Sequence, residues 1–274
     1  MKDYTNTLPN HIEKYIGEND LFLEIFDSEV HGEATEKRPP IIFVHGAYTG
    51  SWMWSKYIPH FISKGFSCYV MNMRSHYKSR VMDLTKVAFE DYLQDIKEVI
   101  SECGETPIII GFSMGGILCQ KLAETVKLAG LVLIDSSISK EVHDIVPYSE
   151  IDEIFRTKII DPAPLREEHS SIDESPEDIA FQKKYLTMES SKAREAYDPS
   201  GAQGGMSINS SLITCPCLVI SRIGNEEEQR RGMATANHLK AEYTGFWNTT
   251  HTGLLVGQRY LEVVDRILEW LKKN

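Results

Sequence analysis

Residues 107–126 read PIIIGFSMGGILCQKLAETV, a stretch in which a glycine-bracketed serine separates an apolar run from a helical pattern. The apolar run predicts a buried strand, and GILCQKLAETV predicts a helix. Between them, Gly111-Phe112-Ser113-Met114-Gly115 matches the motif G-x-S-x-G, which presents a nucleophilic serine when it lies on a tight strand–turn–helix junction. Such a turn strains the backbone of the serine and requires small neighbours. Ser113 is therefore the candidate nucleophile, at the start of a helix whose dipole favours developing negative charge.

Short apolar runs alternate with longer helical patterns on both sides of this stretch. The runs predict buried strands at residues 41–44, 68–72, 107–112, 131–135, 217–220 and 243–247, preceded by a hairpin of 11–16 with 21–27. The helical patterns include one face of Phe89, Tyr92, Leu93, Ile96, Val99 and Ile100, and a final face of Leu261, Val264, Ile267, Leu268 and Leu271. We therefore expect an α/β fold with a mostly parallel sheet, flanked by helices on both faces.

The stretch 139–212 interrupts this rhythm. It is rich in charged residues, serine and proline, yet it contains amphipathic pieces at 150–160 and 176–188. A structureless loop of that length is uncommon in a compact domain. The sequence therefore predicts a helical lid at 139–212, inserted into a core made of residues 1–138 and 213–274.

The composition narrows the classes of partner. The chain has 274 residues and a formal net charge of −11, so nucleic acid is not an expected partner. The polar N-terminal stretch lacks the apolar core of a signal peptide, and no window reaches the ~18 apolar residues of a membrane helix. Five cysteines, an odd number without zinc-ligand spacing, fit a reducing cytoplasm. Since no phosphate loop, dinucleotide fingerprint or metal-ligand cluster is present, we expect no cofactor and no metal.

A second segment strengthens the interpretation of Ser113. His45-Gly46-Ala47 follows the apolar run IIFV, and with the serine motif it makes the chain resemble the α/β-hydrolase superfamily over nearly all of its length outside 139–212. By this resemblance, the backbone N–H groups of Ala47 and Met114 form an oxyanion hole, two fixed donors worth about 3–4 kcal/mol each. His45 itself is interpreted as a structural histidine that closes the loop.

Two further segments resemble parts of the same superfamily. They are GSWMW at 50–54 and NMRSHYKS at 72–79. The second usually reads closer to D-x-R-G-H-G-x-S, and this chain departs from that pattern at Asn72, Ser75 and Tyr77. These departures change a loop rather than the catalytic groups.

A serine hydroxyl needs a base to accept its proton. The fold imposes the chain order nucleophile, acid, base, so the base is expected last. His251, in NTTHTGLL, follows the last predicted strand and precedes the final helix. The other histidines precede Ser113, fall within 139–212, or lie on a helix before the last strand, so His251 is the candidate base.

The acid that should orient this histidine is less clearly marked. The resemblance places it in the loop after the strand at 217–220, where the chain has Asn225, an amide that cannot neutralise an imidazolium. Two carboxylates remain as alternatives. Asp135 ends the preceding strand, and Glu226 follows Asn225 directly. Both keep the chain order, and a site with no acid partner is the third alternative.

Aromatic residues near the predicted site have two interpretations. Tyr48 and Trp52 are candidates for lining an apolar substrate pocket, although the spacing around Trp52 equally predicts core packing. Residues of 139–212 are candidates for the roof of the pocket or for a small core of the lid; they are Phe155, Phe181, Tyr185 and Met188.

These features predict a serine hydrolase that cleaves a carboxylic ester or related small acyl substrate through an acyl-enzyme on Ser113. Acyl transfer, perhydrolysis or lyase chemistry on the same scaffold is the alternative within enzymes, because a fold does not decide its chemistry. A non-catalytic ligand-binding relative is the alternative from another class, favoured by Asn225.

Overall fold

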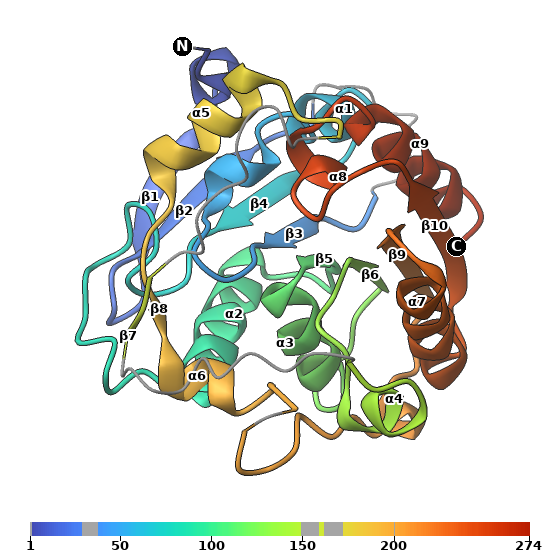
Figure 1. Ribbon diagram of the computed structural model, residues 1–274. Helices are drawn as coiled ribbons and strands as arrows, with labels where there is room; N and C mark the ends of the chain where they lie inside the picture. Colours follow the sequence, from blue (N-terminus) through green and yellow to red (C-terminus); the bar gives the residue numbers. More distant parts are fainter. Residues whose placement is uncertain (1, 29–37, 149–158, 162–171, 200) are drawn as a thin grey trace.

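An eight-stranded sheet forms the centre of the described part of the chain (Figure 1). The structure is a computed structural model, and it describes residues 2–28, 38–148, 159–161, 172–199 and 201–274. The strands follow the order β1-β2-β4-β3-β5-β6-β9-β10. Their bounds are β1 Ile12–Ile16, β2 Leu21–Phe26, β3 Ile41–Val44, β4 Cys68–Met71, β5 Ile108–Phe112, β6 Gly130–Ile134, β9 Cys217–Ile223 and β10 Glu242–Trp247.

The pairing confirms the predicted α/β class. The β1–β2 and β2–β4 pairs are antiparallel, as the predicted hairpin requires, and the other neighbours in this sheet are parallel. The strands β3, β5 and β6 are buried along their whole length. Such continuous apolar strands are expected where helices cover both faces of a sheet.

Helices cover the two faces of the sheet (Figure 1). The longer ones are α2 Phe89–Cys103, α3 Met114–Ala123, α7 Glu226–Leu239 and α9 Tyr260–Leu271. The shorter ones are η1 Tyr4–Thr7, η2 Ser51–Trp54, α1 Ile58–Ile62 and α8 Gly253–Val256. One core cluster joins α2, α3 and α7 to the sheet, and a second joins η2, α1, α8 and α9 to the opposite face.

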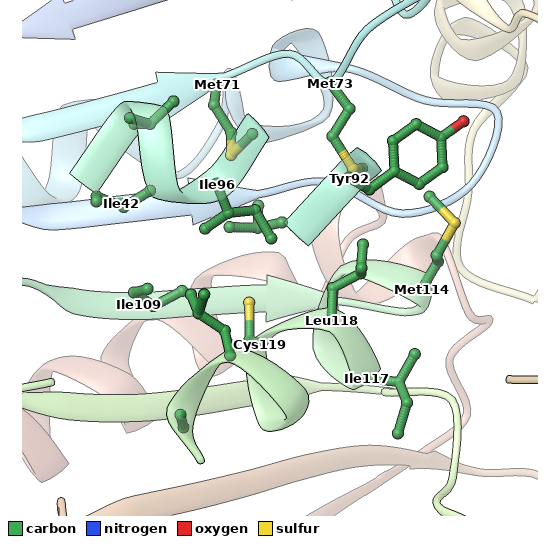
Figure 2. Close-up of a cluster of buried hydrophobic side chains, with 14 of the residues drawn as sticks. Ile42, Met71, Met73, Tyr92, Ile96, Ile109, Met114, Ile117, Leu118 and Cys119 are labelled. Atoms are coloured by element: carbon green, nitrogen blue, oxygen red, sulfur yellow. The ribbon is translucent and has the colours of Figure 1, made fainter. Parts of the chain in front are cut away.

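Successive residues of a strand serve the two clusters in turn. Ile109 packs under α2 and α3, whereas Ile108 and Ile110 belong to the opposite cluster. Figure 2 shows the first cluster, in which Ile96 of α2 and Leu118 of α3 approach the strands. This alternation follows from the two-residue period of a strand.

The predicted helix faces are largely correct. Phe89, Tyr92, Ile96 and Val99 are buried. In α9 the prediction was wrong at one position, because Leu261 is 42% exposed while Val263 and Trp270 are buried. The buried face of α9 keeps the predicted Val264, Ile267 and Leu268 and also includes Val263 and the large Trp270 ring in place of Leu261.

The described parts of 139–212 pack on different regions of the core. They are α4 Lys140–Ile145, β7 Ile159–Ile160, α5 Pro176–Tyr185, β8 Glu189–Ser190, α6 Ser191–Glu195 and η5 Ser210–Leu212. α4 contacts α7, α6 contacts α2, and α5 lies beside the N-terminal η1 (Figure 1). Phe155 and much of the remaining segment lie outside the described residues, so the lid stays a prediction. Among the described helices, none combines the length and apolar character needed to cross a bilayer.

Candidate active site

Ser113 occupies the turn between β5 and α3. Its φ of 54° and ψ of −120° place a residue other than glycine in a strained region of the backbone map. A hydrogen bond helps to stabilise this strained conformation, since the Ser113 N–H donates to the Ile134 carbonyl at 3.1 Å. A Cβ on Gly111 would lie 2.7 Å from the Gly115 carbonyl oxygen, and one on Gly115 would collide with the His45 carbonyl. The small residues of the motif are therefore required by the close approach of helix and strand.

His251 lies in the loop between β10 and α8. Its Nδ1 lies 2.6 Å from Oδ2 of Asp135, and the Phe112 ring stacks on the imidazole with centroids 4.5 Å apart. An ionised carboxylate only accepts hydrogen bonds, so Nδ1 carries the proton and Nε2 keeps its lone pair. That tautomer is the one able to accept a proton from a hydroxyl.

Asp135 is fixed at the end of β6. Its φ of 44° turns the chain out of the strand, its N–H donates to the Ile220 carbonyl at 2.7 Å, and its Oδ1 accepts the Arg222 N–H at 3.1 Å. The carboxylate is thus oriented by the neighbouring strand β9 on one side and by His251 on the other.

Ser113, Asp135 and His251 line one cavity of about 360 Å³. It opens where the parallel strands end, the edge at which α/β sheets bind their ligands. Arg222, Arg231 and Tyr148 also contribute to its wall. Burial raises the pKa of Tyr148, which keeps its phenol neutral. A larger cavity of about 960 Å³ lies at the opposite edge of the sheet, where β5 and β6 begin, and contains none of these groups.

The two alternative acids lie in different surroundings. Asp135 contacts His251, whereas Glu226 is an exposed residue that begins α7. Asn225 is the N-cap of α7, and its side-chain oxygen accepts the Glu228 N–H at 2.9 Å. Asn is among the best N-cap residues, and acidic residues favour the first turn of a helix. The sequence of Asn225 followed by three glutamates is therefore typical of a helix N-terminus.

The HG segment passes directly beside Ser113. A Cβ on Gly46 would lie 2.9 Å from Cβ of Ser113, so Ala47 follows at the edge of the site. Met114 begins α3, and first-turn N–H groups have no partner within their helix. His45 points away from this chemistry, since its Nδ1 donates to the Gly46 carbonyl at 2.8 Å and its Nε2 accepts the Met73 N–H at 3.0 Å. Burial, together with the nearby His76, holds the pKa of His45 well below its usual range.

The two aromatic candidates lie apart from the wall of this cavity. Trp52 is 1% exposed and packs against Phe181 and Tyr185 of α5, with ring centroids 5.5 and 5.7 Å apart. Tyr48 accepts a hydrogen bond from Arg194 at 2.8 Å. Trp52 is thus a core residue that joins η2 to α5, and substrate contact by either residue stays a prediction.

Two polar residues that contact the loop of His251 could not be predicted from the sequence pattern. Asp173 and Glu174 contact the threonines that flank His251, although 76 positions separate Asp173 from Thr249 in the chain. Partners so far apart follow no local pattern, and their pairing emerges only when the chain folds.

One group among the described residues brings possible metal ligands together. The ligand atoms of His11, Glu13 and Glu24 lie within 4.8 Å of one another. They belong to the β1–β2 hairpin, at the far edge of the sheet from Ser113, and Glu13 already accepts a hydrogen bond from Lys78 at 2.9 Å. This group is therefore separate from the cavity of Ser113.

Comparison with known proteins agrees with this fold. The family model for the α/β hydrolase fold matches residues 39–157. An esterase from Exiguobacterium antarcticum superposes with a TM-score of 0.69 at 15% identity, covering 97% of this chain and 100% of that one. A monoacylglycerol lipase from Paleococcus ferrophilus gives 0.65 at 19% identity, covering 92% and 98%. A thermophilic esterase from Thermogutta terrifontis gives 0.64 at 18%, covering 97% and 99%.

No curated protein sequence matches the chain significantly. The matched family model and the solved structures nevertheless agree on the fold, and the serine turn between β5 and α3 fits it. The chain has the α/β-hydrolase fold, and its residues 39–157 match the family model of that fold.

Proposed function

We propose that the protein is a serine hydrolase that cleaves a small carboxylic ester through an acyl-enzyme on Ser113. The observation that carries this proposal is the 2.6 Å contact of His251 Nδ1 with Asp135, in the cavity that Ser113 also lines. The contact orients the imidazole so that Nε2 is available as a base. The esterase and lipase neighbours are consistent with this reaction class.

The reaction follows from these roles. Ser113 Oγ attacks the ester carbonyl while His251 Nε2 accepts its proton, and Asp135 stabilises the imidazolium that forms. The N–H groups of Ala47 and Met114 hold the negative oxygen of the tetrahedral intermediate. His251 then donates its proton to the departing alcohol, which leaves the acyl group on Ser113. Water, activated by the same imidazole, releases the acid and restores the serine.

The alternative of a non-catalytic binding protein loses its main support. Asn225 favoured it, because an amide stood where an acid was expected, but that side chain caps α7 and a carboxylate from β6 reaches His251 instead. The GSWMW segment is buried in the core from Gly50 to Trp54. No observation on the described residues favours acyl transfer over hydrolysis.

Fluorophosphonate labelling tests the proposal. The wild-type protein should be labelled on Ser113, and Ser113→Ala should not. His251→Ala should label at least a hundredfold more slowly, because the general base contributes about 10²–10⁴-fold. A wild-type protein that resists the label would contradict the proposal. Labelling with a single burst of p-nitrophenol from p-nitrophenyl butyrate, but without continued turnover, would instead indicate that an acceptor other than water takes the acyl group from Ser113.

A further inference from the structure

Three threonine hydroxyls in the loop of His251 donate hydrogen bonds to two adjacent carboxylates within 139–212, Asp173 and Glu174. Thr249 Oγ1 donates to Asp173 Oδ2 at 2.6 Å. Thr250 and Thr252, which bracket the histidine, donate to Glu174 at 2.5 and 2.7 Å. Both carboxylates are 5% exposed. The loop that carries the imidazole is thus fastened from both sides to residues about 76 positions earlier.

Asp173 also contacts the backbone around α8. Its Oδ1 accepts the Thr250 N–H at 3.2 Å, and its carbonyl accepts the Gln258 N–H at 2.9 Å. A Cβ on Gly257 would lie 2.6 Å from Asp173 Oδ2, and one on Gly253 would collide with the same carboxylate. Both ends of α8 are therefore shaped to admit this one side chain.

The carboxylates stand on a rigid support. Gln182 of α5 donates to Glu174 at 2.6 Å. On the same helix, Asp178 accepts from Tyr4 at 2.6 Å and from Lys56 at 2.8 Å, and Phe181 is fully buried. Because α5 is tied to η1 and to the core, whatever it holds is fixed relative to the sheet and hence to Ser113.

Burying two neighbouring carboxylates, Asp173 and Glu174, is energetically unfavourable. Burial, together with the charge of Glu174, raises the pKa of Asp173 above its ordinary value. Buried charges give weak support to stability, whereas a satisfied polar network specifies one arrangement. The imidazole of His251 is 39% exposed and is contacted by the Asp135 carboxylate and the Phe112 ring, so the position of its loop helps to decide where the ring lies.

We propose that Asp173 and Glu174 are positioning residues, which hold the His251 loop through its three threonine hydroxyls so that the imidazole stays between Asp135 and Ser113. This inference rests on the proposed hydrolase function of the site. A displacement of ~1 Å in a catalytic group lowers a rate by up to about a hundredfold, so the bonds matter for turnover beyond their effect on folding.

The test uses Glu174→Gln, which keeps the shape of the side chain but leaves one oxygen to accept two threonine hydroxyls, and Thr252→Val, which removes one donor. Each should lower kcat for p-nitrophenyl butyrate by about ten- to a hundredfold with little change in KM. The double variant should lose no more than the worse single variant, because the two changes remove the same interaction.

Asp95→Asn is the matched control. It alters a fully buried carboxylate of α2, which accepts its hydrogen bonds from Arg74 rather than from the threonine loop. It should lower the free energy of unfolding while kcat of the folded protein stays within twofold of wild type. Values of kcat within twofold of wild type for Glu174→Gln and Thr252→Val, or equal losses in all three variants, would overturn the inference.

A second readout separates this inference from the proposed function. The proton on His251 Nδ1 should give a strongly deshielded NMR signal, which broadens in Glu174→Gln and Thr252→Val but not in Asp95→Asn. If the two variants broaden the signal as expected but the wild-type protein resists fluorophosphonate, only the hydrolase proposal would be contradicted. An active wild-type protein whose signal is unchanged in all three variants would contradict the positioning role alone.

Discussion

Ser113 combines a reactive position with an unfavourable backbone. A residue held at positive φ outside the common regions costs about 1–3 kcal/mol, which the surrounding structure must offset. The offset comes from fixed neighbours, including the Gly116 N–H, which donates to the Ser113 carbonyl at 2.9 Å, and the Ser137 N–H, which donates to the same oxygen at 3.1 Å. The residue held in this strained turn lines the cavity that Asp135 and His251 also line.

Relief of this strain can be measured with two variants that both lack the hydroxyl. Ser113→Gly should be more stable than Ser113→Ala by about 1 kcal/mol, because glycine adopts positive φ without a Cβ clash. Chemical denaturation of the two proteins gives the difference directly. Equal stabilities, or a less stable glycine variant, would show that the turn stores no strain at this residue.

Asp135 and Asn225 illustrate which roles of individual residues can be predicted from the sequence. Asn225 with the following glutamates matches a helix start, so its capping role could be predicted from local chemistry. The contact between Asp135 and His251 could be proposed only as one of three alternatives, since it depends on a turn with φ of 44° at the end of β6. Left-handed conformations of aspartate are uncommon, and no neighbouring glycine marked this one.

A buried ion pair links the inserted segment to the loop after β4. His76 donates from Nδ1 to the Arg74 carbonyl at 2.9 Å and from Nε2 to Glu189 of β8 at 3.1 Å, and both side chains of the pair are fully buried. Glu189 also accepts from Tyr92 at 2.5 Å. Both ring nitrogens face acceptors, an arrangement that favours the charged imidazole.

This pair makes the stability of the protein depend on pH. Burial alone would lower the pKa of His76, but the Glu189 carboxylate raises it above the ordinary 6.5. Burial would raise the pKa of Glu189, but the charge of His76 holds it below the ordinary 4.5. The contribution of His76 is complete below pH 6.5 and is lost as the pH rises through its raised pKa. That of Glu189 is complete above pH 4.5 and is lost as the pH falls through its lowered pKa.

The expected outcome concerns one single and one double variant. His76→Gln leaves Glu189 buried without a countercharge and should lower the free energy of unfolding by about 3–5 kcal/mol. The double variant His76→Gln/Glu189→Gln should recover much of that loss, and its stability should vary less with pH above 6.5 than that of wild type. Denaturation curves from pH 5 to 9 measure both. A single variant as stable as wild type would contradict the ion pair.

At the scale of the whole chain, the sequence predicted the strands whose burial restricts them to apolar residues. Continuous apolar runs located β3, β5, β6 and residues 217–220 of β9, because strand segments covered on both faces favour apolar residues. Contacts between distant segments were not readable. The bonds from Asp173 and Glu174 to the threonine loop, and the pair His76–Glu189, join residues that no local period relates.

These long-range contacts give the inserted segment two anchors. β8 is bound through the buried Glu189, and α5 is bound through Asp178 and the ring of Phe181. The account therefore fixes α5 and β8 to the core, and it makes the geometry of His251 depend on contacts outside its own loop.

The rate of ester hydrolysis in Asp135→Asn, compared with Glu226→Gln, tests the central claim most directly. An amide at position 135 would donate to His251 Nδ1, move the ring proton to Nε2 and prevent it from accepting the Ser113 proton. We predict that kcat for p-nitrophenyl butyrate falls about 10⁴-fold in Asp135→Asn, while Glu226→Gln stays within twofold of wild type. A folded Asp135→Asn protein that turns over ester at the wild-type rate, or a comparable loss in Glu226→Gln, would contradict the account.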